Sequence, residues 1–79
     1  MKQVLDLRDR QTFVYDEGLW MKVRDELSAD GHLRMCHCKQ LASIQGDALT
    51  FLISSPTEER FNPYAMVKPV DVVVRLIDA

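Results

Sequence analysis

The sequence predicts an α+β fold: a small sheet of three or four strands, antiparallel or mixed, with two to three helices packed on one face. Three observations support this class. Residues 16–29 space apolar side chains as a helix does, residues 41–53 alternate like a β-hairpin, and residues 70–77 alternate like a single strand. The 79 residues are expected to form one domain, since a chain of this length has material for a single core.

The first fifteen residues allow two interpretations. Apolar residues at 4–7 and 13–15 flank a charged turn at 8–10. This pattern is compatible with a short hairpin, and equally with one strand joined to a loop. Both alternatives stay open from the sequence alone.

A helix is predicted over residues 16–29. Trp20, Val23 and Leu27 follow the spacing i, i+3, i+7, which places them on one helical face. Asp16 is a suitable N-cap, and the Asp-Gly pair at residues 30–31 is a common helix end.

Residues 32–40 are ambiguous. Leu33, Cys36 and His37 fit one face of a helix, whereas Leu33, Met35 and His37 fit one face of a strand. We favour a short second helix that runs into the following hairpin.

A hairpin is predicted over residues 41–53, with its turn at Gln45-Gly46-Asp47. Gly46 supplies the positive φ that a tight turn needs, and Asp47 tolerates such a φ. Leu49, Phe51 and Ile53 form an apolar face that we assign to the core.

A third helix is predicted to start at Ser55, with Pro56 at its first position and Glu58 completing a capping box. Asn62-Pro63 interrupts this helix, and a second short turn is expected from residue 63 to 67. The strand at residues 70–77 then follows, with one apolar face and one half-polar face.

Composition narrows the function classes. The net charge is −2 and the pI about 5.5, whereas proteins held to nucleic acid mainly by phosphate contacts often have a pI above about 9. The chain has no run of about 18 apolar residues, so no membrane partner is expected. Cys36 and Cys38 are too close for an unstrained disulfide, which indicates a reduced, cytoplasmic protein.

From Leu19 onward the order of predicted elements resembles the small KH-like interaction modules of bacterial replication proteins. The segment 19–27, with Leu-Trp at its start, resembles the opening helix of the amino-terminal domain of the initiator DnaA. Residues 31–34, followed by 41–51 with its Gly-Asp turn, are similar to the helix-then-hairpin run of the carboxy-terminal domain of the clamp-loader tau subunit. The resemblance implies a domain that binds other proteins and does not catalyse.

Four side chains with soft-ligand chemistry lie within seven residues: His32, Cys36, His37 and Cys38. A structural zinc site takes four ligands in a tetrahedron, commonly from two separated pairs, and the sequence has no remote second pair. We interpret the cysteines as buried thiols that act as small hydrophobes. No metal and no cofactor is predicted.

No catalytic constellation is predicted either. His37 is adjacent to both cysteines, but neighbouring side chains diverge on a helix and on a strand alike. The chain has no Gly-x-Ser-x-Gly motif and no phosphate-binding glycine loop. The acidic pair Glu58-Glu59 is explained by the N-terminus of the predicted third helix. The sequence therefore predicts that the protein is not an enzyme.

Two segments carry the side chains expected at a protein interface, where Tyr, Phe, Met and Arg are enriched. One is the proline-bounded stretch 60–66, although Phe61 and Met66 could equally cap the core. The other is the edge of strand 70–77, which has few charges to prevent pairing across a homodimer. The candidate interaction residues are Arg60, Phe61, Tyr64, Met66, Asp71 and Arg75.

The sequence thus predicts a small cytoplasmic module that binds and modulates another protein, or a second copy of itself. Its size and lack of catalytic residues favour an origin in a phage or mobile element. The second candidate function is nucleic-acid binding through a local patch of Arg8, Arg10, Lys22 and Arg24. This candidate ranks lower because the chain lacks the Gly-x-x-Gly loop with which KH domains clamp a nucleic-acid backbone.

Overall fold

Antiparallel strands build the fold, and the predicted α+β class is wrong. The computed structural model describes residues 1–52 and 58–72, except for the side chains of residues 33 and 34. Within those residues it has seven strands, one short 3₁₀ turn and no α-helix. In chain order the elements are β1 (Lys2–Gln3), the turn η1 (Val4–Asp6), β2 (Thr12–Tyr15), β3 (Gly18–Leu27), β4 (Leu33–Gln45), β5 (Ala48–Phe51), β6 (Glu58–Phe61) and β7 (Met66–Pro69).

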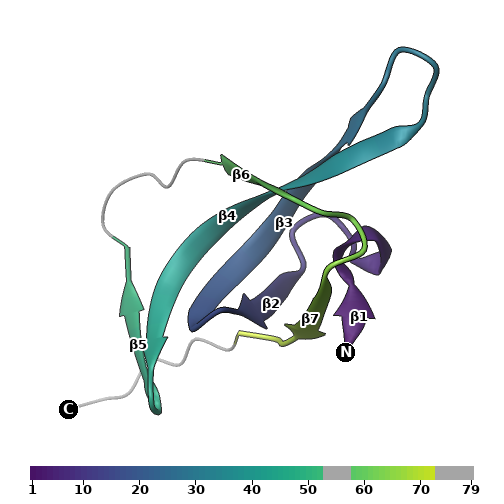
Figure 1. The fold of residues 1–79 in the computed structure, drawn as a ribbon. Coiled ribbons are helices and arrows are strands. Elements are labelled where there is room, and N and C mark those ends of the chain that lie inside the picture. Colours follow the sequence, from purple (N-terminus) through teal and green to yellow (C-terminus); the bar gives the residue numbers. More distant parts are fainter. Residues whose placement is uncertain (53–57, 73–79) are drawn as a thin grey trace.

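The strands form a single sheet that curls strongly (Figure 1). The hydrogen-bonded order is β1-β7-β2-β3-β4-β5, and β6 pairs separately with β4. Strand β4 holds two partners along one side, because β6 pairs with residues 36–39 and β5 with residues 42–45. β6 then leads through a turn into β7, which pairs with β2 on the other side of the sheet. The sheet therefore wraps around one set of buried side chains.

Three β-bulges bend the central hairpin of β3 and β4. The pairing shifts by one residue after positions 19, 22 and 26 of β3. Each bulge adds an unpaired residue and increases the local bend and twist of the strands. One end of the hairpin consequently curves over the core, while its tip projects beyond the other strands (Figure 1).

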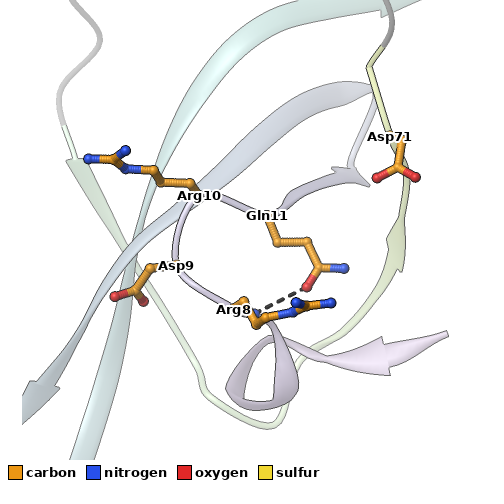
Figure 2. Close-up of a pocket in the computed structure, with 5 residues that line it drawn as sticks. All are labelled: Arg8, Asp9, Arg10, Gln11 and Asp71. Atoms are coloured by element: carbon orange, nitrogen blue, oxygen red, sulfur yellow. Dashed lines mark hydrogen bonds between the residues drawn. The ribbon is translucent and has the colours of Figure 1, made fainter.

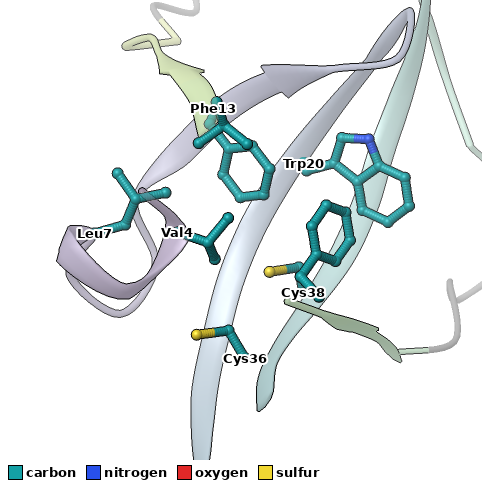
Figure 3. Packing of buried hydrophobic residues seen from close by; sticks show 8 residues of the cluster. Val4, Leu7, Phe13, Trp20, Cys36 and Cys38 are labelled. Carbon is teal, nitrogen blue, oxygen red and sulfur yellow. The ribbon is translucent and has the colours of Figure 1, made fainter. Parts of the chain in front are cut away.

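Aromatic rings meet at the centre of the core. The ring of Phe61 packs edge-on against three others, with centroid distances of 5.7 Å to Phe13, 5.3 Å to Tyr15 and 4.9 Å to Trp20. Phe61 thereby joins β6 to the rings of β2 and β3. Figure 3 shows how the surrounding side chains converge on this cluster, whose other buried members are Val4, Leu7, Cys36, Cys38 and Val67.

The helix predicted over residues 16–29 is wrong. Asp16 and Glu17 form a tight turn, and both have positive φ, 47° and 57°, as a two-residue type I′ hairpin turn requires. The strand β3 follows, and it buries Trp20 and Lys22 on the same face. Because a buried lysine looks polar in the sequence, the alternation of a strand is hidden there. The spacing that suggested a helix includes Leu27, which is exposed.

The second predicted helix, at residues 32–40, is also wrong, and the strand alternative is the correct one. β4 buries Cys36 and Cys38 against the core, while His37 between them lies on the opposite face. A helix would satisfy the backbone of this segment locally. Here β3 and β6 provide the hydrogen-bond partners instead, and only the folded chain brings these strands together.

The hairpin at residues 41–53 is confirmed as far as residue 52. β4 ends at Gln45, β5 begins at Ala48, and Gly46 between them has a φ of +59°. A positive φ at the first central residue alone is the pattern of a type II′ turn. The assignment of the apolar face to the core is wrong, however, because Leu49 and Phe51 are both exposed.

The remaining predicted elements lie partly outside the described residues. Of the predicted third helix and the short turn after it, residues 58–61 form β6, 62–65 form a turn and 66–67 belong to β7, so no helix forms there, while residues 55–57 are not described. The predicted strand 70–77 is not a strand at residues 70–72, and residues 73–77 are not described.

The N-terminal segment is closer to the alternative of one strand and a loop. Residues 4–6 form η1, a turn follows at residues 9–10, and β2 begins at Thr12. The apolar residues at 4–7 and 13–15 therefore do not pair with each other as a hairpin. β1 pairs with β7 instead. No helix in residues 1–52 or 58–72 has the length and apolarity needed to cross a membrane.

Candidate interaction site

The structure separates the predicted interaction residues. Phe61 is only 8 % exposed and belongs to the core, so the alternative that it caps the core is the correct one. Tyr64, at 65 %, and Met66, at 50 %, are well exposed. Asp71 follows the end of β7 and lines a different cleft, together with the loop before β2. Arg75 lies outside the described residues.

A cleft opens beside Phe61, between the end of β2 and the turn that follows β6. Its volume is about 270 Å³, and its lining residues come from positions far apart in the chain. Tyr15 forms one wall, with its ring 5.3 Å from that of Phe61 and still 41 % exposed. The full lining is Tyr15, Glu59, Arg60, Phe61, Asn62 and Ala65.

The turn at residues 62–65 is held firmly beside this cleft. The Asn62 side chain accepts a hydrogen bond from the backbone N–H of Tyr64 at 2.9 Å, and its carbonyl accepts one from Ala65 at 3.0 Å. The carbonyls of Pro63 and Ala65 in turn accept backbone hydrogen bonds from the two residues that begin η1. The hydrogen bond from the Tyr64 N–H to the Asn62 side chain is typical of an Asx turn, which explains why the chain turns at Asn62-Pro63. Tyr64 is consequently displayed on a fixed backbone.

Alternation along β6 divides its side chains between the two faces of the strand. Glu59 and Phe61 lie on the core side and both line the cleft, where Glu59 is exposed and Phe61 is buried. Glu58 and Arg60 lie on the outer face. The guanidinium of Arg60 donates to Glu26 at 2.8 Å, so its charge is already compensated beside the cleft.

A chain of ionisable groups crosses the outer face of β3, β4 and β6. His37 lies at its centre, with Nε2 2.9 Å from Glu26 and Nδ1 3.5 Å from Glu58. Arg24 and Arg60 pair with these two carboxylates from either end. Hydrogen bonding to His37, followed by hydrogen bonding to Arg60, lowers the pKa of Glu26. This network adds side-chain contacts to the backbone pairing that joins β6 to β4.

A second cleft, of about 280 Å³, lies between the loop before β2 and the residues that follow β7 (Figure 2). The backbone N–H of Arg8 donates to the Gln11 side chain at 3.1 Å and closes the loop there. Two arginines and two aspartates line this cleft, so its charges balance and favour neither anions nor cations. The lining residues are Arg8, Asp9, Arg10, Gln11 and Asp71.

The basic patch suggested for nucleic-acid binding is not assembled. Lys22 is 1 % exposed, and its ammonium group donates to the carbonyls of Leu5 at 3.3 Å and Leu7 at 2.9 Å. It also pairs with Asp25 at 3.0 Å. Arg24 lies on the outer face in an ion pair. Of the four residues of the patch, only the two arginines of the second cleft remain together.

The two cysteines are free, buried thiols. Burial raises the pKa of Cys36 to about 11 and that of Cys38 to about 12. The thiol of Cys36 donates to Asp25 at 3.3 Å. Because the thiolate is the reactive form, both groups are poor nucleophiles at neutral pH. His37 lies on the opposite face of β4, and His32 is exposed near the tip of the hairpin.

No group of three or more His, Cys, Asp or Glu side chains among the described residues is arranged to hold a metal ion. Comparisons with models of protein families, with curated proteins and with solved structures gave no match. The resemblance to KH-like modules stays a prediction. The residues that support it lie in β3, in the β3–β4 turn, in β4 and in β5.

Sequence reasoning found Arg60 and Phe61 but missed the other residues of the first cleft. Tyr15 was placed in a strand without a role, and Glu59 was assigned to a helix N-terminus. Tyr15 and Glu59 line one cleft only because the curled sheet brings β6 close to β2. A local sequence pattern does not predict this long-range contact. The tyrosine followed by the Asp-Glu turn offered a weak signal, because an aromatic residue next to a turn can remain exposed.

Proposed function

We propose that this protein acts without catalysis, by binding a segment of another protein at the cleft between Tyr15 and Glu59. The observation that supports this proposal is an exposed aromatic wall backed by a buried ring and flanked by polar side chains. Aromatic side chains of this kind, packed at a partly dry site, dominate the binding energy of many protein interfaces.

The size of the cleft favours a protein segment over a small molecule. Its volume of about 270 Å³ lies below the roughly 300–1,000 Å³ typical of small-molecule sites. A space of this size suits one or two side chains of a partner. Tyr64 and Met66 are both exposed and are neighbours in sequence of Asn62 and Ala65, which line the cleft. We place the protein in the cytoplasm, because two free thiols persist most readily in a reducing compartment.

Site-specific photocrosslinking tests the proposal. The full chain carrying a photoreactive phenylalanine analogue at position 64 is expressed in the source cell, and the crosslinked proteins are identified. We expect Tyr15→Leu to reduce the crosslinked partner severalfold, because the aromatic wall is lost while apolar cover over the core is kept. Leu27→Ala is the matched control, since it removes an exposed apolar side chain from the distant hairpin tip.

Two results would contradict the proposal. The first is crosslinking of the same partner, at the same yield, by wild type and the Tyr15→Leu variant when both are folded. The second is co-purification, without irradiation, of nucleic acid that dissociates steeply between low and moderate salt, which is the behaviour of phosphate-bound complexes.

A further inference from the structure

We propose that the Tyr15–Glu59 cleft accepts a basic side chain of the partner, and specifically an arginine. This inference rests on the proposed function of the cleft as an interaction site. It specifies the chemistry of the partner: a guanidinium group stacked on the ring of Tyr15 and bonded to the carboxylate of Glu59.

The charge around the cleft supports a cationic occupant. Every ion pair of β6 within the described residues uses Glu58 or Arg60, on the outer face, and leaves Glu59 out. The only other charged lining group is Arg60, whose guanidinium is held by Glu26 at 2.8 Å. The cleft therefore carries the charge of one exposed carboxylate, in a protein whose net charge is −2. Both favour the approach of a positive group and disfavour an anion.

The aromatic wall supports the same conclusion. The Tyr15 ring is backed edge-on by Phe61, and the Tyr15 carbonyl accepts a hydrogen bond from the Trp20 indole at 3.1 Å. The hydrogen bond holds the backbone of Tyr15, and the contact with Phe61 supports one side of its ring, so less entropy is lost when a partner binds than for an unsupported side chain. Cations over such a ring are attracted by its negative face. An apolar side chain would also pack on the Tyr15 ring, but it would bury the Glu59 carboxylate without a hydrogen-bond donor or a positive charge.

Arginine fits better than lysine for a geometric reason. A guanidinium is planar and can stack on an aromatic ring while its edge donates two hydrogen bonds to one carboxylate. Tyr15 and Glu59 line the same cleft from two different strands and provide these two surfaces. An ammonium group, as a compact and strongly hydrated charge, uses only one of them at a time.

Titration of the isotopically labelled full chain by NMR tests the inference. The probe is the peptide acetyl-Gly-Ser-Arg-Ser-Gly-amide, compared with the same peptide carrying lysine or the uncharged isostere citrulline. We expect the arginine peptide to shift the amide signals of residues 15, 59, 61 and 62. The lysine peptide should bind more weakly, and the citrulline peptide should cause no saturable shift.

The variants make the test specific. Glu59→Gln should weaken binding of the arginine peptide about fivefold, the upper end of the range for an exposed charge pair. Asp47→Asn is the matched control, because it removes the same charge from the exposed tip of the β4–β5 turn and should leave binding unchanged. Tyr15→Leu should reduce binding by a similar factor through loss of the stacked ring.

Equal binding of the arginine and citrulline peptides, or unchanged binding by Glu59→Gln, would overturn the inference. The same holds if no peptide shifts the signals of the cleft. If only the arginine specificity is wrong, crosslinking at position 64 would still depend on Tyr15, and the proposed binding function would stand. If crosslinking is also independent of Tyr15, the proposed function fails with it.

Discussion

Replacement of Phe61 by alanine should destabilise the protein more than any exposed substitution in the same segment. Truncation of a buried phenylalanine typically costs about 3–5 kcal/mol in free energy of unfolding. Phe61 is 8 % exposed and also makes edge-on contacts with three rings, each worth about 0.5–1.5 kcal/mol beyond area burial. Partial exposure of one of these rings, Tyr15, lowers that contribution. We therefore expect a loss of about 4 kcal/mol.

A loss of this size is a large fraction of the stability of a small domain, which is about 5–15 kcal/mol in general. The protein has a single tryptophan, and Trp20 lies 4.9 Å from Phe61. Its fluorescence therefore reports urea unfolding from the centre of the core. The midpoint of Phe61→Ala should fall far below that of wild type, and the slope should stay the same if unfolding remains two-state.

Tyr64→Ala is the control for this prediction. Tyr64 is exposed three residues further on, so its truncation should change the free energy of unfolding by less than about 0.5 kcal/mol. A loss below about 1 kcal/mol for Phe61→Ala would refute the conclusion that β6 completes the core. It would instead favour the interpretation of Phe61 as an interface residue.

Four further predictions concern buried residues. Lys22→Met should cost about 1–3 kcal/mol in urea unfolding, because two buried carbonyls lose their donor. Gly18→Ala should cost about 1–3 kcal/mol and shift the Trp20 emission, because the added Cβ would lie 2.7 Å from the indole nitrogen; unchanged emission and stability would contradict this packing. Cys36 and Cys38 should react with a thiol reagent at pH 8 only as fast as the protein unfolds, and rapid modification of the native protein would disprove their burial. Because burial raises both thiol pKa values from 9.0, to about 11 and about 12, their contribution to stability should be complete below pH 9 and decline as the pH rises through 11–12.

The sequence predicted some turns well and the long elements badly. Gly46 was identified from local chemistry alone, because a positive φ at a tight turn is a property of the residue itself. The turn at Asp16-Glu17 was missed, since Asp16 is equally suited to a helix N-cap and Glu17 is not a usual choice for positive φ. Without that turn, the apolar spacing of β3 was interpreted as a helix. The segment that forms the start of β4 was then interpreted as a second helix.

In the candidate site, too, residue types were predictable from the sequence, whereas long-range contacts were not. The stretch 60–66 was recognised as a surface of interest from its residue types, and Tyr64 and Met66 are indeed exposed. Phe61 could not be assigned to the core or the surface from the sequence, because an exposed aromatic and a buried one look identical there. Glu59 and Tyr15 could not be paired, since they are 44 positions apart and meet only through the curled sheet.

By itself, the sequence determined the Gly46 turn and the low net charge. These features depend on single residues and their nearest neighbours. The tertiary structure alone decided that the long segments are strands, that Lys22 is buried and that a cleft forms beside Phe61. A strand obtains its hydrogen bonds, and a buried lysine its carbonyl partners, from distant parts of the chain, and no local pattern specifies which parts these are.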